Sequence, residues 1–162
     1  MPTEASTPLE TSLAALARLD GHVKLKGLNQ LAQAFLEPGL EKNPQIAIKL
    51  ASQAIALAIN LHDQAALAQS QAILGASYVQ TLNFDLAIEA YKTAFTQYEQ
   101  LEDQRGSAKM LLEQGQVYRT LEQHQDAREK LAAGLELSRF ANARDLEAEC
   151  LNGLAAIYDF EG

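Results

Sequence analysis

The sequence predicts an all-α protein, a solenoid built from antiparallel helix pairs. A repeat at 40-residue intervals is the first observation, since Gly75 and Tyr78 return as Gly115 and Tyr118. A period of this size is typical of stacked supersecondary units. Apolar residues also recur at three- and four-residue steps along almost every segment, which indicates amphipathic helices. The breaks between segments are short, so sequential helices are expected to be antiparallel neighbours.

The first helix is expected over about 8–19. Thr7, Pro8 and Glu10 have the spacing of a capping box, with Thr7 as the N-cap, Pro8 at the first helical position and Glu10 reaching back. Asp20-Gly21 is expected to end this helix.

Seven further helices are expected, separated by short breaks. Glu37-Pro38-Gly39 is expected to stop the second helix, and Asn43-Pro44 to start the third. Asp63 and Asp103 occupy equivalent places before two later helices, and each is predicted to be an N-cap that contributes about 1 kcal/mol. The expected ranges are 23–36, 44–60, 64–81, 84–101, 104–121, 124–140 and 144–159.

Small residues at a constant phase predict close helix packing. Gly75 and Gly115 lie in the middle of periodic helices, where glycine costs roughly 0.5–1 kcal/mol relative to alanine. Their recurrence predicts that a facing helix lies too close for a Cβ atom. Ala47, Ala87 and Ala127 are expected to supply the matching small face on the second helix of each pair.

The repeated pattern resembles the tetratricopeptide repeat, in which a small residue is followed by Tyr three positions later and by Ala nine positions after that. The resemblance covers about residues 23–162 and implies a right-handed superhelix. A unit of 40 residues is similar to the longer-helix variant found in bacterial signalling and regulatory proteins. The residues that carry the resemblance are Gly75, Tyr78, Ala87, Gly115, Tyr118, Ala127, Ala155 and Tyr158.

The repeat register divides the chain into a flexible N-terminus at 1–7 and a single array over 8–162. The last helix is expected to lack a partner helix and to carry an apolar face that includes Leu151 and Leu154. Terminal repeats normally need a polar outer face, so this face implies a fragment of a longer protein or burial in a homodimer. A frayed true C-terminus is the remaining alternative. The expected units are a half unit at 8–21, repeats at about 23–61, 62–101 and 102–141, and a half unit at 142–162.

Composition disfavours several classes of partner. The net charge of −8 and the pI near 4.8 disfavour binding to nucleic acid or to an anionic membrane, because both partners are negatively charged. No stretch reaches the roughly 20 apolar residues that span a bilayer. Cys150 is the single cysteine in the sequence, which favours a reducing compartment. The predicted location is therefore the cytoplasm.

No pattern in the sequence predicts catalysis, a cofactor or a metal site. His22, His62 and His124 fall at helix edges without a second ligand at metal-binding spacing. Cys150 has no neighbouring base and is expected to be a buried small residue. The glycines form no phosphate-binding loop. The chain is therefore not expected to be an enzyme.

The resemblance implies a partner-binding groove, because the first helices of tetratricopeptide pairs line a concave surface that holds a peptide or helix. Ala76, Gln116 and Ala156 stand where carboxylate-clamping members carry their main Asn, so that clamp is not predicted. Lys109 and Arg119 could both reach one acidic ligand, although ordinary surface charge is the simpler interpretation. The groove residues carried over by register are Gln69, Ile73, Ala76, Lys109, Leu112, Glu113, Gln116, Arg119, Glu149, Asn152 and Ala156.

The leading functional hypothesis is a protein–protein interaction scaffold that binds a peptide or helix of another protein. One alternative is an N-terminal sensory or regulatory domain of a larger bacterial signalling protein, attached for example to a diguanylate cyclase or a histidine kinase. Another is a self-associating module that dimerises through its last helix.

Overall fold

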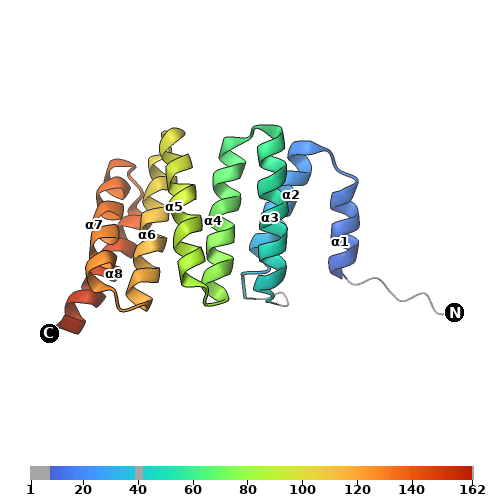
Figure 1. Ribbon diagram of the computed structural model, residues 1–162. Helices are drawn as coiled ribbons and strands as arrows, with labels where there is room; N and C mark the ends of the chain where they lie inside the picture. The colour runs from blue at the N-terminus through green and yellow to red at the C-terminus, as the bar shows by residue number, and fades with distance from the viewer. Residues whose placement is uncertain (1–7, 39–41, 162) are drawn as a thin grey trace.

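A computed structural model describes residues 8–38 and 42–161 of the chain. Within these ranges the structure consists of α-helices without a strand, which confirms the predicted all-α array. Figure 1 shows the helix pairs stacked in one row, with α1 at one end and α7 and α8 together at the other. The helices are α1 (Pro8–Ala17), α2 (Gly21–Ala34), α3 (Pro44–Leu61), α4 (Gln64–Gln80), α5 (Phe84–Gln100), α6 (Gln104–Thr120), α7 (His124–Phe140) and α8 (Arg144–Glu161).

The same tight turn ends each helix from α3 to α7. At the end of α4, the Leu82 N–H donates to the Val79 carbonyl at 3.0 Å and the Asn83 N–H donates to the Tyr78 carbonyl at 2.9 Å. These two bonds form a Schellman motif, in which the residue that donates the first bond adopts a left-handed conformation. Here that residue is never glycine. The left-handed residues, with φ between 54° and 59°, are His62, Leu82, Glu102, Glu122 and Asn142.

The next helix starts two residues after each left-handed residue, which makes the turns short and the neighbouring helices antiparallel. Asp63 accepts a hydrogen bond from the Ala66 N–H at 3.0 Å, and Asp103 accepts one from the Gly106 N–H at 2.8 Å. Both predicted N-caps are therefore confirmed. Asn43 caps α3 in the same way through the Ile46 N–H.

The start of the chain differs from the prediction. Gly21 does not end α1 but begins α2, with Asp20 as its N-cap in extended conformation. The helix therefore resumes two residues earlier than predicted. Thr7 and Gly39 lie outside the described residues, so the proposed capping box and the stop signal after α2 are only partly described.

The mid-helix glycines make room for bulky side chains, and not for an alanine face as predicted. A Cβ atom at Gly75 would lie 2.6 Å from Cδ1 of the Tyr91 ring, and one at Gly115 would lie 2.6 Å from Cγ of Leu131. Tyr91 and Leu131 are the equivalent residues of α5 and α7, and both are fully buried. Glycine on the first helix therefore accommodates a large side chain from the second helix of the same pair.

The core follows the row as three successive clusters of buried side chains. The first joins α2, α3 and α4, the second joins α4, α5 and α6, and the third joins α6, α7 and α8. α3 is long and apolar enough to span a membrane by length and composition alone. One face of α3, which includes Leu50 and Ala54, is buried in the first cluster.

Candidate binding groove on the first-helix face

The helices α2, α4, α6 and α8 are the first helices of successive pairs, and their common side is called here the first-helix face. α2 packs against α4 on this face, and α6 packs against α8. Two adjoining clefts, of about 440 and 230 Å³, follow the contact between α2 and α4. Asn29, Gln30 and Gln69 line both, so the two form one elongated groove, called here the α2–α4 groove.

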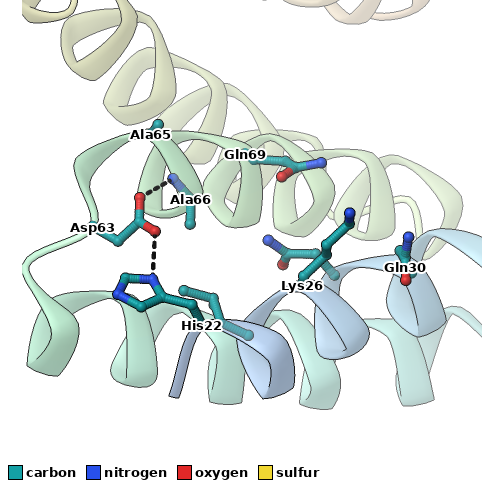
Figure 2. Close-up of a pocket in the computed structure, with 9 residues that line it drawn as sticks. His22, Lys26, Gln30, Asp63, Ala65, Ala66 and Gln69 are labelled. Carbon is teal, nitrogen blue, oxygen red and sulfur yellow. Dashed lines mark hydrogen bonds and ion pairs between the residues drawn. The ribbon is translucent and has the colours of Figure 1, made fainter. Parts of the chain in front are cut away.

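His22 and Asp63 form one end of this groove. Nδ1 of His22 lies 3.1 Å from Oδ2 of Asp63, while Oδ1 of Asp63 accepts the N–H of Ala66 (Figure 2). The Asp63 carboxylate is therefore held both by a partner side chain and by the N-terminus of α4, where a negative charge is stabilised. His22 thus ties α2 to the start of α4.

Asn29 lies at the bottom of the groove, where it is 2% exposed. Its Oδ1 lies 2.8 Å from the Ser70 hydroxyl, itself buried on α4. The Nδ2 atom of Asn29 is buried and has no hydrogen-bond partner among the described residues. The Ser70 hydroxyl also lies 2.8 Å from the Ala66 carbonyl oxygen, and its single proton can be donated to only one of the two acceptors. When that proton goes to Ala66, the Asn29 amide can turn so that Nδ2 donates to the Ser70 hydroxyl oxygen.

Long polar side chains form the walls of the groove. Figure 2 shows Lys26 and Gln30 on α2 and Gln69 on α4, all exposed and all bordering the same space. Lys26 forms no ion pair with a described residue. The apolar side chains of Leu25 and Ile73 line the bottom of the groove, one in each of its two clefts. The groove therefore offers amide donors and acceptors, one cation and some apolar surface.

The structure places the sequence-predicted groove residues in three environments. Ile73 and Leu112 have only 5% and 2% of their surface exposed, so neither offers a side chain to a partner apart from the edge of Ile73 in the groove. Ala76, Glu113, Gln116 and Ala156 are half-buried. The exposed members are Gln69, Lys109, Arg119, Glu149 and Asn152.

Only Gln69 and Ile73 of the predicted set line the α2–α4 groove, whereas His22, Lys26, Asn29 and Gln30 do not belong to that set. The register contained a signal for α2, because Asn29 lies 40 residues before Gln69. Phe35 stands 40 residues before Gly75, where the repeat pattern has glycine, so the helix pair that contains Asn29 matches the pattern less well than the later pairs.

The α6–α8 part of the first-helix face carries a partly buried carboxylate. Burial raises the pKa of Glu113, nearby Glu149 raises it further, and Lys109 opposes the shift. Arg105 and Asp145 bridge the starts of α6 and α8, with Nη1 2.9 Å from Oδ1. The hydrogen bond from Arg105 lowers the pKa of Asp145. This ion pair is exposed and contributes little stability.

The remaining chemically notable side chains are not gathered into a reactive site. Burial raises the pKa of the Cys150 thiol to about 11, and Glu149 adds to the shift. The thiol is fully buried beside Gly134, as the sequence predicted for a small core residue. In the described part of the chain, no three His, Cys, Asp or Glu side chains come together as a possible metal site.

No protein-family model matches the chain, and no curated protein matches its sequence. Solved structures do match. The apo form of RapI superposes with a TM-score of 0.80 at 12% identity, over 92% of this chain and 54% of RapI. Aspartyl phosphate phosphatase F from Bacillus subtilis superposes with a TM-score of 0.84 at 13% identity, over 92% of this chain and 38% of that protein.

At these identities the likeness shows the fold alone, a helical-repeat array of the tetratricopeptide type. The chain spans 54% and 38% of the lengths of the two neighbours. Neither likeness assigns a function to a residue of this chain.

Proposed function

We propose that this protein is a non-catalytic interaction module that binds a peptide or helix of a partner protein on its first-helix face. The observation that carries the proposal is the elongated α2–α4 groove, which is lined by exposed amide side chains and has the buried Asn29 side chain at its bottom. The helical-repeat fold supports the same class of function, because such arrays present extended surfaces to partners.

The dimensions of the groove suit a short extended segment. Its lining residues on α2 run from His22 to Ala34, a span of about 18 Å at 1.5 Å per residue. An extended chain of about five to six residues covers that length at 3.3 Å per residue. The amides of Gln30 and Gln69 can each donate and accept, as a peptide backbone requires.

A random peptide library displayed on phage and selected on the intact chain tests this proposal. Peptides that bind the wild type should bind the double variant Gln30→Ala, Gln69→Ala at least tenfold more weakly, because the amides that pair with the peptide backbone are removed. Gln125→Ala, a change at an exposed position on α7, is the control and should leave binding unchanged. Selected peptides that ignore the groove variant would contradict the proposal.

The sequence-predicted extension onto α6 and α8 is a separate part of the proposal. If the partner also contacts α6, the variant Lys109→Glu, Arg119→Glu should weaken it as well, because both side chains are exposed. Unchanged affinity would confine binding to the α2–α4 groove.

Self-association through α8 is a second candidate function, supported by a comparison of equivalent positions. The last helix exposes Leu151 and Tyr158, with 43% and 58% of their surface accessible. The equivalent Leu111 is 8% exposed because α7 follows α6, and Tyr118 is half-buried. Leu151→Glu should convert a dimer into a monomer in sedimentation velocity, with Leu86→Glu on α5 as the control. A wild-type chain that sediments as a monomer at high concentration would exclude this role.

A regulatory role within a larger signalling protein is a further candidate, supported by the partial coverage of both structural neighbours. Immunoblotting of the native protein tests it. A band far above 17.6 kDa would support a role as one part of a longer chain, and a band at that mass would contradict it.

A further inference from the structure

We propose that the chain assembles head to tail, with α1 of one copy covering the exposed face of α8 on the next copy. This inference rests on the self-association proposed for α8, and it names the surface that α8 binds. The two helices are complementary halves of a pair. In the described part of the row, α8 is a first helix without a second helix after it, and α1 is a second helix without a first helix before it (Figure 1).

The pair formed by α6 and α7 shows how a first helix receives its second helix. A Cβ atom at Gly115 would lie 2.6 Å from Cγ of Leu131, and one at Gly134 would lie 3.4 Å from Cβ of Leu111. Ala108, three residues before Leu111, is fully buried. The second helix therefore packs along one strip of the first helix, in which small residues alternate with larger apolar ones.

α8 repeats this strip 40 residues later and leaves it exposed. Leu151 is exposed, whereas the equivalent Leu111 is buried. Tyr158 is exposed as well, and the Arg128 guanidinium of α7 lies 5.2 Å from the centroid of its ring and holds the ring in place. The exposed residues of this side, called here the α8 strip, recur at three- and four-residue steps and are Ala148, Leu151, Ala155 and Tyr158.

α1 has more apolar surface than its contact with the rest of the row covers. Its residues 13–17 are all apolar. Leu9 and Leu16 pack against the first core cluster, while Leu13 and Ala14 are exposed. A helix segment that is apolar all round is normally buried on more than one side. α1 also packs against α2 much less extensively than α3, α5 and α7 pack against the helices that follow them.

The repeat register indicates how α1 would lie on the α8 strip. Ala14 lies 40 residues before Ala54, which is fully buried in the first core cluster. On α7 the same position is Gly134, which lies against Leu111. A small residue at this position lets the first helix approach closely. Ala14 is therefore expected to lie against Leu151 of the next copy, because Leu151 is the equivalent of Leu111.

A head-to-tail contact is heterologous, because two different surfaces meet. Every dimer then keeps one free α1 and one free α8 strip, so further copies can be added. A contact between two α8 helices is isologous and stops at the dimer. The two arrangements therefore respond differently when α1 is altered.

Two blocked variants distinguish these arrangements in sedimentation velocity. Leu151→Glu blocks the α8 strip and Ala14→Glu blocks α1, and both positions are exposed in the single chain, so neither charge is buried there. Each variant alone should sediment as a monomer. Their equimolar mixture should form a 1:1 dimer and nothing larger, because one intact α1 and one intact α8 strip remain.

Ala56→Glu and Leu86→Glu are the matched controls, because they place the same charge at exposed positions of α3 and α5 within the row. Both should assemble like the wild type, which is expected to form dimers and longer species as its concentration rises. Circular dichroism checks that each variant keeps its helices. Ala17→Glu, at another exposed position of α1, replaces Ala14→Glu if that variant loses helical signal.

The inference and the proposals on which it builds fail differently. A dimer of the Ala14→Glu variant alone would overturn the head-to-tail contact and leave self-association through α8 standing. A mixture of the two blocked variants that stays monomeric would also overturn the head-to-tail contact. A wild-type chain that stays monomeric at high concentration would overturn both forms of self-association and leave the peptide groove untouched.

Discussion

Gly115 leaves space for the side chain of Leu131 on the facing helix α7. A Cβ atom there would meet Leu131 at 2.6 Å from Cγ and at 3.3 Å from the backbone nitrogen, so the neighbouring helix itself must move. Gly115→Ala is therefore expected to lower the free energy of unfolding by about 1–3 kcal/mol, although alanine favours helix. Urea denaturation measures the change.

Gly134→Ala is the matched control for that substitution. At Gly134 a Cβ atom would lie 3.3 Å from the Cys150 sulfur and 3.4 Å from the Ala108 carbonyl oxygen, which leaves room for a small adjustment. The gain in helix propensity, up to about 1 kcal/mol, should nearly offset that strain. Equal losses for both variants would contradict the role assigned to Gly115.

Glu113 should make the protein less stable as the pH rises. Its pKa in the folded state lies above the ordinary value of 4.5, chiefly because of burial. The folded state therefore binds more protons than the unfolded state over the range just above pH 4.5, and stability falls as pH increases through that range. Glu113→Gln removes this effect, so its urea midpoint should exceed that of the wild type by more at pH 7 than at pH 4. Midpoints that differ between the two proteins by the same amount at pH 4 and at pH 7 would contradict this role of Glu113.

At the scale of the helix, the same turn recurs after each helix from α3 to α7. Three of its five left-handed positions, Leu82, Glu102 and Glu122, carry side chains that resist that conformation, at a cost of roughly 1–2 kcal/mol per residue, whereas His62 and Asn142 adopt it more readily. The following helix begins two residues after each left-handed residue, so the turn has the same length whichever residue occupies that position.

Leu82→Gly is expected to stabilise the protein by about 1 kcal/mol. Leu82 has a φ of 59°. It also exposes 74% of its surface, so little burial is lost. Leu101→Gly is the control, because Leu101 has a right-handed φ of −86° and gains nothing from glycine. Thermal unfolding should give a higher Tm for the first variant and an unchanged or lower Tm for the second. The same shift in both would contradict this account of the turn.

At the scale of the whole molecule, the array is held together by contacts between successive helices, so stability should vary along the row. α1 contacts the first core cluster mainly through Leu9 and Leu16 and packs against α2 on one side. α6 contributes to two clusters and packs against α5, α7 and α8.

Native-state hydrogen exchange should reveal this gradient. Amides of α1 are expected to exchange fastest, and those of α4 and α6 slowest, because each of these two helices contributes to two core clusters and its opening exposes both. Protection of α1 equal to that of α6 would show that the array unfolds as a single cooperative unit.

The sequence by itself determined the architecture of this protein, because repeat period and helix phase are local properties. The spacing of Gly75 and Gly115 and the apolar steps between them are sufficient to place the helices and the short turns. The N-caps at Asp63 and Asp103 were predictable for the same reason, since a cap acts on a backbone group only three residues away. The start of α2 at Gly21 was missed because a glycine is compatible both with a helix end and with a helix start.

Only the tertiary structure decided which side chains the glycines accommodate and where the groove lies. Tyr91 reaches Gly75 across a helix pair, a contact that depends on the rotation of both helices. Asn29 and Ser70 meet across two units, and both are buried. The first contact depends on the packing within a pair and the second on the angle between successive repeats, and the spacing of residues along one helix specifies neither.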